Sequence, residues 1–215
     1  FQIEGTSSHA SEPHKGNPPF HVLSSLIGPN STLSTLPEKL LQENLIDSQK
    51  SNGLLLATPV YLQIGCDGDF GILPANGTLN ITCRADKTED LSILKDAIYK
   101  VVQTETIQGG CRLISMDVME PFPAVVNDER RTKVVEQASE MNGLKLHEMS
   151  SPFPWSEDFA YFGEYFETGA TLFGLGSGEN HPPLHSKEYD FNDDLIPIGV
   201  KLWESIAKIG LQQDC

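Results

Sequence analysis

Two stretches of alternating apolar and polar residues, at 58–66 and 78–84, constrain the fold of this chain most. Strict alternation is typical of β-strands with one buried face, because successive side chains point to opposite sides of the sheet. In the first stretch, the side chains that we expect to be buried are Val60, Leu62, Ile64 and Cys66. The pattern predicts a sheet with one covered face and one open face.

The second stretch places an arginine on the open face of this sheet. Its apolar residues, which we expect to be buried, are Leu79, Ile81 and Cys83. Arg84 alternates with them, so its side chain should point to the opposite face. Arg84 is therefore a candidate for binding a ligand.

The first half of the chain has the element order of a ferredoxin-like fold. Residues 1–5 and 112–118 have the pattern of short strands, whereas residues 6–13 are small and polar, as in a loop. Apolar residues recur at helical spacing at 20–27, 37–46 and 91–101. The resulting order is βαββαβ, in which helices cover one face of the sheet.

The second half of the chain is predicted to be a separate α/β region. Pro121 and Pro123 favour an extended link, so we expect a domain boundary there. The elements expected after the link are helices at 127–141, from 156 and from 194, and strands at 144–147 and 171–175. These strands are too few for a complete sheet. Because Phe1 also resembles the middle of a strand, we expect the chain to be part of a longer protein.

Charge and cysteine content narrow the range of partners and compartments. The net charge is -15, with 15 basic residues against 30 acidic ones, which argues against binding of nucleic acid or anionic membranes. No run approaches the roughly 18 apolar residues of a membrane span. The cysteines, which form no CxxC pair and are expected to be buried thiols, are Cys66, Cys83, Cys111 and Cys215. A reducing, cytoplasmic location follows, although glycosylation-type triplets at Asn30, Asn76 and Asn80 leave a secreted origin open.

Two histidines are candidates for chemistry. His185 follows two prolines and a leucine, a context that restricts the backbone, and neutral imidazole is the commonest metal ligand. On spacing alone, a loop histidine hydrogen-bonded to the backbone is the favoured interpretation. His9 lies among small residues and, on its own, has the pattern of an ordinary surface histidine.

A carboxylate cluster and a glycine-rich segment surround His185 in the sequence. Glu157, with Ser156 and Asp158, can cap a helix or leave one carboxylate facing a cleft. Gly176, in the glycine-rich segment 174–178, can let a ligand approach backbone amides, or can simply end a strand. Both alternatives stay open at this point.

Taken in order, these motifs resemble the M20 metallopeptidases, and most closely the branch of hippurate, N-acyl-amino-acid and auxin-conjugate hydrolases. The resemblance covers the whole chain. The matching motifs are Gly5-Thr6-Ser7-Ser8-His9-Ala10 with Pro13, Ile72-Leu73-Pro74 leading to Arg84, Ser156-Glu157-Asp158-Phe159-Ala160, Phe173-Gly174-Leu175-Gly176, and Leu184-His185-Ser186 with Phe191-Asn192-Asp193.

The resemblance implies a lid or dimerisation domain at 1–118 and the C-terminal portion of a zinc-peptidase-like catalytic domain at 119–215. It implies that His185 is the last metal ligand and that His9 reaches across a homodimer to polarise the scissile carbonyl. Arg84 would bind the substrate carboxylate, and Glu157 and Gly176 would contact substrate. The expected cofactor is one or two divalent ions, zinc or alternatively manganese or cobalt. The expected substrate is an N-acyl amino acid or small peptide.

Two departures from the family pattern qualify this expectation. The family usually has asparagine before its Ile-Pro turn, where this chain has Gly71. The other metal ligands and the general base of the family have no counterpart here, so we expect the chain alone to be inactive. The alternative hypothesis is a non-catalytic dimerisation or binding module derived from such an enzyme.

Overall fold

The computed structural model of this chain describes residues 1–47, 54–153, 155, 157–166 and 169–213. It divides into two compact units, which are described separately. The first comprises Phe1–Ala124 with Ser151–Ser156, and the second comprises Val125–Ser150 with Glu157–Cys215.

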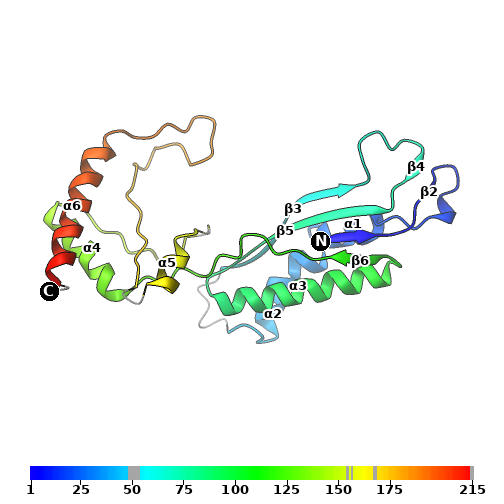
Figure 1. The fold of residues 1–215 in the computed structure, drawn as a ribbon, viewed down its shortest axis with the longest axis horizontal. Coiled ribbons are helices and arrows are strands. Elements are labelled where there is room, and N and C mark those ends of the chain that lie inside the picture. Colours follow the sequence, from blue (N-terminus) through cyan, green and yellow to red (C-terminus); the bar gives the residue numbers. More distant parts are fainter. Residues whose placement is uncertain (48–53, 154, 156, 167–168, 214–215) are drawn as a thin grey trace. The chain divides into compact units, whose positions relative to one another are not determined.

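The first unit contains a four-stranded antiparallel sheet in the strand order β3-β5-β1-β6 (Figure 1). Its strands are β1 (Gln2–Glu4), β3 (Leu55–Ile64), β5 (Asn76–Ala85) and β6 (Arg112–Ser115). The helices are α1 (Phe20–Ile27), α2 (Thr32–Gln42) and α3 (Thr88–Gln108). The predicted ferredoxin-like arrangement is confirmed, with α2 as an additional helix between α1 and β3.

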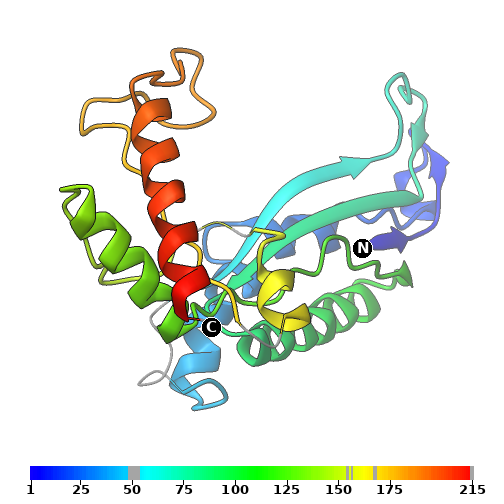
Figure 2. The same ribbon diagram turned by 60° about the vertical axis from the view of Figure 1, so that its left-hand side comes forward.

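One apolar core lies between this sheet and its helices. In α3, Leu94, Ile98 and Val102 are fully buried at a spacing of four residues, which puts them on one helical face. They share the core with Ile3 of β1 and Leu79 of β5. Figure 2 shows α3 running alongside the long strands β3 and β5.

The predicted buried face of β3 is wrong. Val60 is 60% exposed and Leu62 is 39% exposed, while Ile64 is only partly buried. The register with β5 shifts between Pro59 and Tyr61, which leaves Val60 as the extra residue of a bulge. A bulge breaks the alternation of faces, and an edge strand such as β3 tolerates both the bulge and a proline.

The cysteine prediction needs a related correction. Cys66 follows β3 in an exposed turn, where its backbone N–H donates to Asp69 Oδ2 at 2.8 Å. Cys83 and Cys111 are half-buried and pack against the core, and all three are free thiols. Cys215 lies outside the described residues.

Short elements also differ from the sequence prediction. Helix α2 begins at Thr32, because Ser31 caps it by accepting a hydrogen bond from Ser34 N–H, and Pro37 lies inside the helix. The segment predicted as a loop contains the short strand β2 (Ser8–His9) and the 3-10 helix η1 (Pro13–Lys15). Strand β2 pairs with β4 (Ile72–Leu73) in a separate two-stranded sheet.

The second unit contains α4 (Glu129–Met141), α5 (Ala160–Tyr165) and α6 (Leu195–Gln213). Helices α4 and α6 pack together through buried apolar residues that include Ala138 and Leu202. Asp128 caps α4 by accepting a hydrogen bond from the Arg131 N–H at 2.9 Å. These two helices match the prediction.

The strands predicted at 144–147 and 171–175 are absent from the described part of this unit. A strand needs a neighbouring strand to supply its hydrogen-bond partners. At Leu172, the side-chain amide of Asn127 takes that role, donating to the Leu172 carbonyl and accepting from its N–H, both at 2.9 Å. None of the described helices combines the length and apolar content that a bilayer-spanning segment needs.

Candidate active site

The small sheet of β2 and β4 presents His9 to the outside. His9 lies directly opposite Ile72, and Ser8 lies opposite Leu73. Directly opposed residues point to the same face of an antiparallel pair. His9 and Ile72 are exposed, whereas Ser8 and Leu73 are half-buried, so the imidazole lies on the open face.

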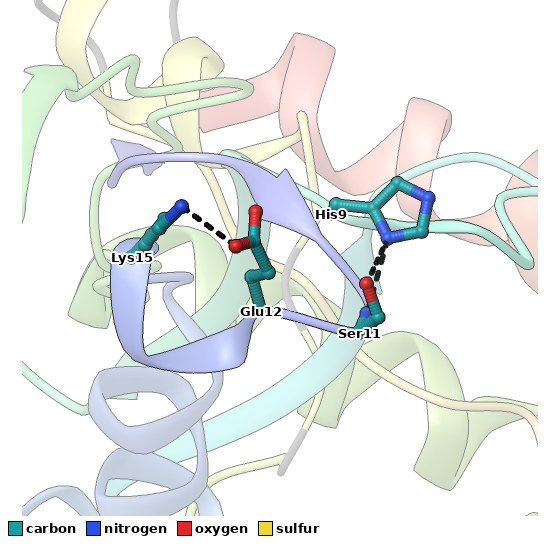
Figure 3. A network of polar contacts seen from close by, with 4 residues as sticks. All are labelled: His9, Ser11, Glu12 and Lys15. Carbon is teal, nitrogen blue, oxygen red and sulfur yellow. Dashed lines mark hydrogen bonds and ion pairs between the residues drawn. The ribbon is translucent and has the colours of Figure 1, made fainter.

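A tight turn after His9 holds its ring in place (Figure 3). The Glu12 N–H donates to the His9 carbonyl at 2.8 Å, which closes the turn. Inside it, His9 Nδ1 lies 2.7 Å from Ser11 Oγ and accepts from the Ser11 N–H at 3.2 Å. The sequence prediction did not single out Ser11. A serine two residues after a histidine, in a turn, is the signal that could have identified it.

Arg84 lies on β5, across from Leu56 of β3. Leu79, Ile81 and Cys83 face or pack against the core, so the alternating position of Arg84 puts it on the other face, half-buried. Burial raises the pKa of the Cys83 thiol, which favours the protonated, non-nucleophilic form.

His9 and Arg84 lie toward opposite ends of β5. Strand β4, which carries the partner of His9, lies just before β5 begins at Asn76 (Figure 1). Arg84 is eight residues further along the strand. At about 3.4 Å per residue, Asn76 and Arg84 are roughly 27 Å apart, and β4 lies beyond the Asn76 end of the strand. The first unit therefore does not bring them to one site.

His185, in the second unit, has an unusual backbone conformation. Its φ is +72°, and the Ser186 N–H donates to the Pro183 carbonyl at 3.0 Å, which makes His185 the third residue of a tight turn. Glycine is favoured at such a position, because a side chain costs energy at positive φ. The exposed imidazole of His185 is thus held in a strained turn, as the preceding prolines indicated.

An acidic depression of about 450 Å³ is lined by residues that flank His185 on both sides in the sequence. His181 contributes to its wall, donates through Nδ1 to the Pro182 carbonyl at 2.9 Å, and contacts Tyr189 edge-on. The lining residues are His181, Pro182, Glu188, Asp190, Phe191, Asn192, Asp193 and Asp194. His185 is not one of them.

Glu157 and Gly176 are both exposed. Helix α5 begins at Ala160, later than predicted, with no side-chain cap at Phe159, so Glu157 does not cap it. Ser156 lies outside the described residues. A Cβ built at Gly176 would meet nothing within 4 Å, so packing within the described structure does not require a glycine there.

The described residues do not complete a metal centre by themselves. Within those ranges, no group of three or more His, Cys, Asp or Glu residues is placed to hold an ion. A catalytic zinc site uses about three protein ligands. Among the residues that the structure describes, His185 therefore lacks the companion ligands that a bound ion would need.

Comparison with known proteins identifies the family. The model of "Peptidase family M20/M25/M40" matches residues 13–209, which is most of the chain. The chain belongs to this family. The M20 chain is 24% identical over 214 residues to the IAA-amino acid hydrolase ILR1-like 4 of Arabidopsis thaliana, and 25% identical over 209 residues to the hippurate hydrolase of Campylobacter jejuni.

Each alignment covers 96% of the M20 chain, but only 45% and 50% of the respective relative. The chain thus spans about half the length of the curated relatives it matches. Its fold resembles that of the aminobenzoyl-glutamate utilization protein from Klebsiella pneumoniae, with a TM-score of 0.53 and 17% identity. That match covers 76% of this chain and 38% of the other.

Proposed function

We propose that this M20 chain is part of a metal-dependent amidohydrolase that cleaves the amide bond of N-acyl amino acids or small peptides. The observation that carries the proposal is the outward-facing imidazole of His9, held by Ser11 in a chain that matches the family over residues 13–209. The names of the two relatives support this substrate class, because hippurate and amino-acid conjugates are N-acyl amino acids.

In this proposal, His9 and Arg84 recognise opposite ends of the substrate. The imidazole donates a hydrogen bond to the scissile carbonyl and stabilises the negative charge that develops on its oxygen. The guanidinium binds the substrate carboxylate, for which a planar, bidentate donor is well suited. Glu157 and Gly176 contribute further substrate contacts.

The separation of roughly 27 Å along β5 supports a homodimer formed through the first unit. In an N-acyl amino acid, only the amide nitrogen and the α-carbon separate the scissile carbonyl from the carboxylate. One substrate therefore cannot contact His9 and Arg84 of the same copy. We assign His9 to the site of the partner and regard the first unit as the lid, with the catalytic portion following it.

His185 is the one metal-ligand position that we assign to this chain. The remaining ligands of one or two divalent ions, with zinc as the first candidate, would come from other parts of the longer protein. When bound, such an ion supplies Lewis-acid activation of water or of the carbonyl. The strained backbone of His185 supports a functional role, because strain of this kind is concentrated at active sites.

The test uses two histidine variants of the full-length protein. His185→Ala should lower the affinity of the protein for metal on the order of 10-fold or more, because one ligand is lost. The variant should therefore bind less metal and have no turnover. His9→Ala should retain the metal and lose turnover by about 100-fold or more. Elemental analysis and hydrolysis of N-acyl amino acids measure both. Unchanged metal content in His185→Ala would contradict the ligand assignment.

A second candidate function is a non-catalytic dimerisation module. Gly71, where the family pattern has asparagine, favours it, because a Cβ there would meet nothing within 4 Å and the fold itself does not exclude asparagine. Full-length protein that dimerises but hydrolyses no N-acyl amino acid, even with Gly71→Asn, would support this alternative.

We also propose a cytoplasmic location. The three free thiols Cys66, Cys83 and Cys111 support it, because thiols persist in reducing compartments.

A further inference from the structure

The geometry points to Ser11 as the residue that fixes the imidazole tautomer of His9, so that Nε2 carries the proton. Ser11 is outside the motif that carries the family resemblance, and neither the family pattern nor the comparisons give it a role. It lies two residues after His9, in the turn closed by the Glu12 N–H.

The two hydrogen bonds to His9 Nδ1 determine the tautomer. A backbone N–H can only donate, so the contact of 3.2 Å from Ser11 N requires a lone pair on Nδ1. The hydroxyl of Ser11, at 2.7 Å, can donate to the same lone pair. With Nδ1 as the acceptor, the proton of the neutral ring must be on Nε2.

The neighbouring charges do not compete for the ring. The Glu12 carboxylate, which could otherwise accept a proton from imidazole, is paired with Lys15 Nζ at 2.6 Å (Figure 3). Within the described part of the chain, Ser11 provides both side-chain hydrogen bonds of His9. The Nε2–H group is therefore left on the exposed side of the ring.

The consequence for catalysis rests on the proposed function. A carbonyl oxygen needs a donor, and Nε2–H supplies one. In the other tautomer, Nε2 would present a lone pair to that oxygen and repel it. Ser11 would then be a positioning residue, which prepares His9 before substrate arrives and does not touch the substrate itself.

His181 provides an internal reference, because its ring should have the opposite tautomer to that of His9. A carbonyl oxygen can only accept, so the contact of 2.9 Å to the Pro182 carbonyl requires a proton on Nδ1 of His181. The two rings should therefore carry their protons on different nitrogens in the same molecule.

Nitrogen-15 NMR of the histidine rings tests the inference on this chain, at a pH of about 8, where histidine is in general neutral. Long-range proton–nitrogen spectra should show His9 with the proton on Nε2 and His181 with the proton on Nδ1. In Ser11→Ala the Nδ1–H form of His9 should increase, while Ser11→Thr, which keeps a hydroxyl, should resemble the wild type.

The matched control is Ser24→Ala. The Ser24 hydroxyl donates to the backbone carbonyl of His21 and to no imidazole ring, so its removal should leave every tautomer unchanged. An Nδ1–H tautomer of His9 in the wild type, or identical populations in the wild type and Ser11→Ala, would overturn the inference.

Kinetics of the full-length protein separate this inference from the proposed function. Ser11→Ala should lower kcat by about 3- to 10-fold, the equivalent of one hydrogen bond, with little change in KM, and Ser11→Thr should restore it. An unchanged kcat in Ser11→Ala would overturn the positioning role. If the wild type hydrolyses no amide, the proposed function fails, and the NMR result still decides whether Ser11 sets the tautomer.

Discussion

Two single residues in this chain are in energetically unfavourable environments or conformations. His185 has a positive φ without being glycine, and Asp90 is buried in the first turn of α3 with no partner for its Oδ2 within the described ranges. Each state carries an energetic cost. Each therefore gives a substitution whose effect on stability has a definite sign.

The backbone strain at His185 predicts that glycine is better than alanine at this position. Alanine keeps the Cβ that positive φ disfavours, so His185→Gly should be more stable than His185→Ala by about 1 kcal/mol. Chemical denaturation of the two variants measures the difference. Both should lose metal equally in the full-length protein. If alanine is as stable as glycine, the turn is not strained.

The burial of Asp90 predicts a pH dependence of stability. Desolvation is the main cause that raises the pKa of its carboxyl above 3.8, so the folded state holds this proton more tightly than the unfolded state. The contribution to stability is greatest below pH 3.8 and falls as the pH rises through the raised pKa. Asparagine does not ionise, so Asp90→Asn abolishes the decrease in stability that Asp90 causes as the pH rises. The free energy of unfolding of Asp90→Asn should therefore increase relative to that of the wild type between pH 4 and 7. Denaturation across that range tests it, and a difference independent of pH would contradict it.

At the scale of elements, the long periodic segments were predictable and the short or paired ones were not. Helices α3, α4 and α6 each repeat an apolar residue over several turns, which is a strong local signal. Strand β2 has two residues and exists only because β4 pairs with it. The bulge at Val60 likewise depends on the register with β5. Sequence alone does not contain these partners.

The candidate site shows the same division. The exposed position of His9 and the place of Arg84 on the open face of the sheet agree with the sequence expectation. The contact between His9 and Ser11 comes from a turn that the polar pattern of residues 6–13 did not specify. The family was predicted correctly from its motifs. The roles of His9, Arg84, Glu157, Gly176 and His185 remain predictions.

The edge strand β3 offers a test of the proposed dimer. No described strand pairs with its outer edge, and this edge together with the exposed Val60 forms a surface on which another strand could pair. Val60→Lys should weaken dimerisation, measured by analytical ultracentrifugation, while it changes the stability of the first unit by only about 0.5 kcal/mol. The control Leu79→Ala, at a fully buried position of β5, should instead cost about 2–5 kcal/mol. Unchanged dimerisation in Val60→Lys would exclude this edge as the interface.

At the scale of the whole molecule, the proposed active site combines residues from two subunits with parts of the longer protein that lie outside this chain. This chain supplies about half the length of its relatives, and within its first unit His9 and Arg84 are separated by most of the length of β5. A single copy therefore cannot place both residues on one substrate. The central claim is that His9 of one subunit acts in the site that contains Arg84 of the other.

Complementation between two inactive variants tests this claim most directly. Full-length His9→Ala and Arg84→Ala proteins are each expected to be inactive, and are mixed under conditions that exchange subunits. Half of the resulting dimers are mixed, and each has one site with both native residues, so about a quarter of the wild-type activity should return. If His9 and Arg84 instead acted from the same subunit, every site in the mixture would lack one of them. Activity no higher than that of the separate variants, with subunit exchange demonstrated, would contradict the account.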